Sequence, residues 1–109
     1  MKTYHLNELG VIGGRESNSD IYIKNLLLGI DHKDAELHSH PDSDEYYVIL
    51  DGKVLFEHGE EKVNVEIETG GVICFGRGEL HRIAQITTPT KVMIIKSTNS
   101  VRDTKNRAK

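Results

Sequence analysis

The sequence predicts an all-β domain, arranged as a sandwich or a small barrel. Between residues 21 and 96, short apolar runs are separated by turn residues about every 8–12 positions, a spacing typical of such folds. No run of about ten residues keeps a helical period without an interrupting Gly or Pro. The 109 residues are enough for one domain and leave little room for a second.

Two strands and the turn after one of them are the most clearly predicted elements. In Val63–Glu68, branched apolar residues alternate with polar ones, so one face should be buried and the other exposed to water. Tyr46–Leu50 is apolar throughout, which predicts a central strand covered on both faces by a second sheet or a partner subunit. Asp51 and Gly52 lie between this run and Lys53–Phe56. Because Gly tolerates a positive φ, the pair predicts a two-residue type I′ hairpin.

The remaining turns and the two ends follow from Gly, Pro and polar composition. Further turns are predicted at Gly59-Glu60, Thr69–Gly71, Gly76–Gly78 and Thr88–Thr90. Residues 1–97 should form the domain, with an N-terminal edge strand at Tyr4–Leu6 and with Gly10, Gly13 and Gly14 interrupting regular structure. Residues 98–109 are polar, and we expect them to form a frayed tail because they cannot bury enough surface to offset the entropy of ordering.

Composition excludes several classes of partner. The chain has 14 basic and 17 acidic residues and a formal charge of −3, so no basic surplus favours nucleic acid. The longest apolar stretch, Leu26–Ile30, is too short to cross a bilayer, and the first residues do not resemble a signal peptide. We therefore expect no membrane association and a cytoplasmic location. The single cysteine, Cys74, excludes an internal disulfide and a multi-cysteine zinc site, and we expect its side chain to be buried.

A group of histidines and a glutamate is the chemically distinctive feature. In an extended strand, His38 and His40 project from the same face, and Glu45 follows after a short turn. His81 can join them only if the sheet closes on itself, as in a barrel. Three imidazoles and one carboxylate suit one divalent transition metal ion, namely Fe, Mn, Ni, Co or Zn. Such an ion can keep open positions for water or a substrate oxygen.

These residues resemble the two motifs of the cupins. His38, His40, Glu45 and Gly52 match the first motif, and Gly70, Gly78 and His81 match the second. The resemblance covers roughly residues 21–96, and the short stretch between the motifs is similar to that of small single-domain cupins of the cupin-2 type. His32, Gly76 and Gln85 depart from the usual Gly, Pro and Asn. Asp44 competes with Glu45 as the acidic ligand, and we favour Glu45 for its longer side chain.

The resemblance implies both a fold and a range of functions. The fold is a small antiparallel β-barrel, also described as a double-stranded β-helix and similar to a jelly roll. Because such cupins include dioxygenases, decarboxylases and isomerases, we expect a small-molecule metalloenzyme, an oxidoreductase or an isomerase. One alternative is a non-catalytic module that binds a sugar or another small molecule, or acts as a sensor. Another alternative is a structural metalloprotein, in which the ion only holds strands together. Small cupins are often dimers, so a homodimer is expected.

Two further residues are candidates for substrate binding or for support of the ligands. Tyr47 lies two positions after Glu45, and Gln85 lies four positions after His81, so each shares a face with a ligand in a regular strand. The alternative is a tyrosine that fills the core and a glutamine bonded to the backbone. His5, His32 and His58 have no partner at ligand spacing, and we expect them at the surface.

Overall fold

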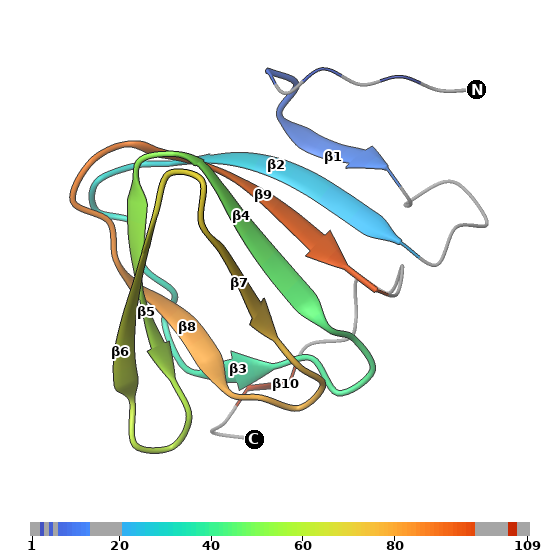
Figure 1. Ribbon diagram of the computed structural model, residues 1–109. Helices are drawn as coiled ribbons and strands as arrows, with labels where there is room; N and C mark the ends of the chain where they lie inside the picture. The colour runs from blue at the N-terminus through green and yellow to red at the C-terminus, as the bar shows by residue number, and fades with distance from the viewer. Residues whose placement is uncertain (1–2, 4, 6, 14–20, 98–104, 107–109) are drawn as a thin grey trace.

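The protein is built from two antiparallel sheets that face each other, as the computed structural model shows (Figure 1). It describes residues 3, 5, 7–13, 21–97 and 105–106, and these residues contain strands but no helix. The first sheet has the order β1 (Gly10–Gly13), β2 (Tyr22–Leu28), β9 (Thr90–Lys96), β4 (Glu45–Asp51) and β7 (Val72–Phe75). The second sheet has the order β10 (Lys105–Asn106), β3 (His38–Ser39), β8 (His81–Gln85), β5 (Lys53–His58) and β6 (Val63–Glu68). The all-β prediction is confirmed.

The chain passes repeatedly from one sheet to the other. The connections from β2 to β3, β3 to β4, β4 to β5, β6 to β7, β7 to β8 and β8 to β9 all change sheets. Only the β1–β2 and β5–β6 connections among these described strands join neighbours within one sheet. Strands that wind alternately between two facing sheets form a double-stranded β-helix, the fold expected above.

The predicted hairpin at Asp51-Gly52 is wrong, although the turn itself exists. β4 pairs with β7 and β9, whereas β5 pairs with β6 and β8, so the turn carries the chain between sheets. Gly52 has a φ of 113°, and a Cβ there would lie 2.4 Å from Thr90 Oγ1. Its N–H donates to Thr69 Oγ1 over 2.8 Å, and its carbonyl accepts the Thr69 N–H over 2.9 Å. The sequence pair therefore indicates a positive φ but does not determine which strands pair.

The core lies between the two sheets and is apolar and aromatic. The Tyr47 and Phe56 ring centroids are 4.9 Å apart, and those of Phe56 and Phe75 are 5.4 Å apart. Ile49 and Val92 pack against this group without exposed surface. Each side chain buried in this way contributes roughly 1.5–3 kcal/mol to folding. The core therefore holds the two sheets at a fixed separation.

One prediction about burial is met within the chain only in part, and another is wrong. The chain itself covers one face of Tyr46–Leu50: Tyr47 and Ile49 face the core, while Tyr46 is 39% exposed on the outer face, where only a partner subunit could supply the second cover. Cys74 is exposed rather than buried, because it lies opposite Tyr46 in the β4–β7 ladder and shares its outward face. By contrast, β6 has the predicted wet face, although Val63 at its start is 54% exposed because β6 lies at a sheet edge.

Both ends of the chain add an edge strand. The N-terminal edge strand is β1 rather than a strand at Tyr4–Leu6, where the described residue His5 lies outside any strand; β1 pairs with β2 and spans Gly10 and Gly13, so the prediction that these two glycines interrupt regular structure is wrong. An edge strand tolerates glycine because it pairs on one side only. Tyr4 and Leu6, which belong to the edge strand that the sequence predicts, lie outside the described residues. Of the predicted tail, residues 98–109, only β10 is described, and it pairs with β3.

Candidate metal centre

The four predicted ligand residues come together at one end of the space between the sheets. His38 lies in β3 directly opposite His81, the first residue of β8, and His40 follows β3. Glu45 is the first residue of β4, to which the chain returns through the turn at residues 41–44. One ligand atom from each of the four residues lies within 4.8 Å of all the others. Closure of the two sheets therefore brings His81 to the first motif.

Two of the distances between ligand atoms in this group match those expected around one ion. His81 Nε2 lies 2.8 Å from Glu45 Oε1, and His40 Nε2 lies 3.1 Å from the same oxygen. The ring centroids of His38 and His81 are 4.5 Å apart. Two ligands at right angles around an ion, with bonds of about 2.1 Å, stand about 3.0 Å apart. The group therefore has the right size for a single first-row metal ion.

Backbone carbonyls orient two of the imidazoles. His81 Nδ1 lies 3.0 Å from the carbonyl oxygen of Glu79, and His38 Nδ1 lies 3.3 Å from that of Glu36. Because a carbonyl can only accept, each Nδ1 carries the hydrogen and the Nε2 lone pair becomes available to an ion. A neutral His81 has one N–H and cannot also donate from Nε2 to Glu45. A cation between Nε2 and the carboxylate satisfies both groups.

The ionisation states are those that metal binding requires. Burial by itself raises the pKa of Glu45, but hydrogen bonds and charge interactions with His40 and His81 outweigh it and lower the pKa to about 2. Burial, followed by repulsion from His81, lowers the pKa of His38 below its ordinary value. At neutral pH the carboxylate is therefore ionised and His38 is neutral, which are the forms that ligate metals.

Aromatic neighbours hold the group in place. The ring of Phe75 stacks on His81 with centroids 4.1 Å apart and an interplanar angle of 2°. Tyr47 is buried beside the ligands, and its ring centroid lies 6.3 Å from that of His81. Burial and then the charge of Glu45 raise the pKa of Tyr47 well above its ordinary value, so its phenol stays protonated and can hydrogen-bond the carboxylate. Tyr47 thus lies next to the group, as predicted.

Gln85 does not lie next to the group. Ile83 is opposite Phe56 and Gln85 is opposite Leu55, so Ala84 is an extra residue, a β-bulge, in β8. A bulge turns the following side chain to the other face of the strand. Gln85 is accordingly exposed on the outer face, whereas His81 faces inward and is buried. The prediction that Gln85 shares a face with His81 is wrong for this reason.

The competing acid and the other histidines have different roles. The Asp44 carboxylate accepts the N–H of Arg77 over 3.1 Å and so ties two turns together. His58 Nε2 lies 2.7 Å from Glu79 Oε2, and His32 Nε2 lies 3.7 Å from Asp34 Oδ1. Neither histidine belongs to the metal-binding group.

Several groups that support the ligands have no signature in the sequence. The carbonyls of Glu36 and Glu79 act through the backbone, so their residue types carry no information about this role. Gly76, a departure from the family's usual proline, donates its N–H to Glu79 Oε1 over 2.8 Å. Proline could not make this bond because it has no N–H. The substitution therefore fits a turn that is held by Glu79.

Comparisons with known proteins agree with this fold. A family model described as "Cupin domain" matches residues 29–96. A protein with a double-stranded β-helix domain from Klebsiella pneumoniae superposes with a TM-score of 0.72 at 12% identity, covering 91% of this chain and 77% of that one. A cupin protein from Bacteroides fragilis superposes with a TM-score of 0.71 at 15% identity, covering 92% of this chain and 86% of that one. For oxalate decarboxylase from Bacillus subtilis the TM-score is 0.68 at 18% identity, with 82% of this chain but 24% of that one covered.

These likenesses differ in what they show. At such identities the solved structures show the fold alone, and no curated protein matches the sequence. Among the described residues, no helix is long and apolar enough to cross a membrane. The family model spans more than half of the chain and includes both motifs and all four candidate ligands. The chain therefore belongs to the cupin domain family.

Proposed function

We propose that this protein binds one divalent transition metal ion through His38, His40, Glu45 and His81 and acts there on a small molecule. The observation that carries the proposal is the orientation of His81. Its Nδ1 is held by a backbone carbonyl while its Nε2 faces a buried carboxylate. Metal-bound histidines characteristically have such a partner at the other ring nitrogen.

The donor set narrows the choice of ion. Imidazole and carboxylate suit Fe, Mn, Ni, Co or Zn. The only thiol, that of Cys74, lies exposed on the outer face of the first sheet and cannot join the group. When bound, such an ion supplies Lewis acidity and, in the case of iron or manganese, chemistry with dioxygen. The four ligands would hold it, and Tyr47 lies buried beside Glu45 and His81.

The approach of a small molecule is expected beside His38. This residue is half-buried, whereas His40, Glu45 and His81 are buried. A dioxygenase-, decarboxylase- or isomerase-like activity fits an ion with open positions on this side. Similarity in fold to oxalate decarboxylase supports a decarboxylase-like activity only at the level of the scaffold.

One observation favours the alternative of a non-catalytic binding or sensor module. Tyr47, the candidate acid or base nearest to the ligands, is buried and engaged with Glu45, and its pKa is raised well above the ordinary value. A group of this kind transfers protons poorly at neutral pH. Turnover would then depend on the ion and the substrate rather than on proton transfer by Tyr47.

The first experiment is elemental analysis of natively purified protein. We expect about one equivalent of one transition metal, and a melting temperature that falls after chelation and recovers on addition of that metal. Small carboxylic acids, polyols and sugars are then screened with and without dioxygen. Consumption of a compound only by the loaded protein supports an enzyme, and saturable binding that requires the metal but occurs without consumption supports the alternative. Protein that neither retains nor takes up any of the five metals contradicts the proposal.

We also propose that the protein is a homodimer that associates through the outer face of the first sheet. On β4, β7 and β9 this face presents Tyr46, Val48, Val72, Cys74, Met93 and Ile95. Val72 is 56% exposed. Asp51 and Lys91 bring charge to this face, and they lie opposite each other at one end of the β4–β9 ladder. Lys91 Nζ donates to Asn7 Oδ1 over 2.8 Å, and a second copy would cover the apolar surface beyond this charged end of the face.

A further inference from the structure

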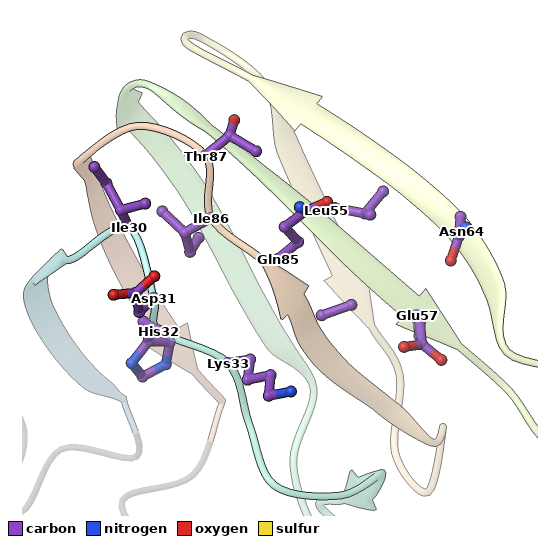
Figure 2. Close-up of a pocket in the computed structure, with 11 residues that line it drawn as sticks. Ile30, Asp31, His32, Lys33, Leu55, Glu57, Asn64, Gln85, Ile86 and Thr87 are labelled. Atoms are coloured by element: carbon purple, nitrogen blue, oxygen red, sulfur yellow. The ribbon is translucent and has the colours of Figure 1, made fainter.

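A groove of about 660 Å³ lies on the outer face of the second sheet (Figure 2). The loop at residues 30–33 forms one side, and Asn64 on β6 lies on the other. Leu55 and Gln85 lie between them. This volume is within the range of about 300–1,000 Å³ that is usual for small-molecule sites. None of the four candidate metal ligands lines the groove, so it is a second, separate site.

The register of the second sheet aims the polar side chains into this groove. Asn64 lies opposite Glu57, and Gln85 lies opposite Leu55, so these residues share the outer face. Gln85 reaches this face only because of the bulge at Ala84. Bulges that re-aim a side chain are frequent next to functional sites. The displaced Gln85 therefore marks the groove rather than the metal centre.

The groove has fixed walls. The Asp34 N–H donates to the Ile83 carbonyl over 2.9 Å, and the Ile83 N–H donates to Asp34 Oδ2 over 2.9 Å, which attaches the loop to β8. Arg82 donates from Nε and Nη2 to Glu57 Oε1 over 3.0 and 2.6 Å. Walls that are already ordered reduce the entropy cost of binding a ligand.

The side chains around the groove indicate the chemistry of a ligand. Lys33, Asn64, Gln85 and Thr87 line it, and within the described part of the chain their side chains have no hydrogen-bond partner. Together they offer both donors and acceptors, as vicinal hydroxyl groups require. Leu55 and Ala84 supply an apolar floor for a carbon skeleton.

The charges around the groove balance. Asp31 and Lys33 line it, and Glu57 is paired with Arg82, so two acidic groups face two basic ones. A ligand with a net charge would gain little from such surroundings. We propose that this groove binds a small uncharged polyhydroxylated molecule, with the chemistry of a mono- or disaccharide. The proposal does not depend on the metal centre.

The test is an NMR titration of the full chain with D-glucose and with maltose, before and after chelation of metal. We expect saturable shifts of backbone amides at residues 30–33, 55–57 and 84–87, and the same Kd in both preparations. Gln85→Ala and Asn64→Ala should each raise the Kd about fivefold, as expected for the loss of one or two hydrogen bonds. Glu68→Ala is the matched control, since Glu68 is exposed on β6 outside the groove, and it should leave the Kd unchanged.

Three outcomes would overturn the assignment. The first is the absence of saturable shifts with both sugars. The second is a set of shifts confined to residues 38–45 and 81, which would place the binding at the metal centre. The third is tighter binding of D-glucuronate or D-glucosamine than of D-glucose, which would show that a charged ligand is preferred.

Discussion

At the scale of single residues, His81 and His58 make a matched pair for testing the metal centre. His81 is 1% exposed within the ligand group, whereas His58 forms an ion pair with Glu79 whose side chains are 41% and 45% exposed. We expect His81→Ala to weaken metal binding by more than about 100-fold, beyond the 10–100-fold typical of residues around the ligands. His58→Ala should retain metal, because an exposed ion pair contributes little. Metal content after dialysis measures both, and equal retention would contradict the ligand assignment.

The pH dependence of metal binding is also decided by individual side chains. Because the pKa of Glu45 is lowered to about 2, its carboxylate stays ionised down to about pH 5 and does not limit binding there. Protons compete for the imidazoles instead, so metal affinity should fall between about pH 7.5 and about pH 5.

The Glu45→Gln variant distinguishes the contribution of the carboxylate ligand to metal binding from that of the imidazole ligands. The variant loses a charged donor, so we expect weaker binding at every pH, while affinity still falls on acidification because three imidazoles continue to compete for protons. Metal titrations at several pH values measure both quantities. Metal content that is equal at the two ends of this range in the wild type, or a flat pH profile in Glu45→Gln, would exclude the imidazoles as the competing sites.

At the scale of elements, the crossing between β4 and β5 depends on Gly52. Its φ of 113° is unfavourable for other residues, and a Cβ would meet Thr90 Oγ1 at 2.4 Å and Thr90 Cα at 3.0 Å. We expect Gly52→Ala to lower the free energy of unfolding by roughly 2–4 kcal/mol, since strain and a clash add.

Gly59, in the β5–β6 hairpin, is the control for this substitution. Its φ of 78° is also positive, but a Cβ added at Gly59 would meet no atom within 4 Å. Gly59→Ala should therefore lower the free energy of unfolding only by the cost of backbone strain, about 1–2 kcal/mol. Urea unfolding of both variants at one fixed metal concentration compares them. Equal losses would mean that contact with Thr90 does not matter at the crossing.

The elements also show how far the sequence leads. Alternation in Val63–Glu68 and the glycine turns predict strands correctly, because side-chain period and φ are local properties. Pairing is not local: Asp51-Gly52 has the composition of a hairpin, yet β4 and β5 each have two other neighbours. The bulge at Ala84 is likewise set by the partner strand, and it alone moves Gln85 away from His81. The four ligands were predictable from their spacing along the chain, because the family motifs have this spacing in a barrel whose closure brings the ligands together.

At the scale of the whole molecule, the outer face of the first sheet exposes large apolar side chains to solvent. Its side chains at the centre, such as Val48 and Met93, lie opposite each other across the β4–β9 ladder. On the second sheet, the corresponding outer face carries Asn64, Glu66 and Glu68 on β6 and the Arg82–Glu57 ion pair. This difference in polarity predicts which face associates, and it predicts a symmetric contact because both copies offer the same apolar patch.

Two equally exposed valines on the two sheets test the dimer. Val72 on β7 is 56% exposed and Val63 on β6 is 54% exposed. Val72→Lys would place a charge in the proposed contact, where burial without a partner is costly, and should give monomers. Val63→Lys changes charge and size equally but lies on the other sheet, and should leave the dimer intact. Light scattering gives the mass, which should be twice 12.3 kDa for wild type and Val63→Lys. A wild-type mass of 12.3 kDa, or dissociation by Val63→Lys alone, would refute this interface.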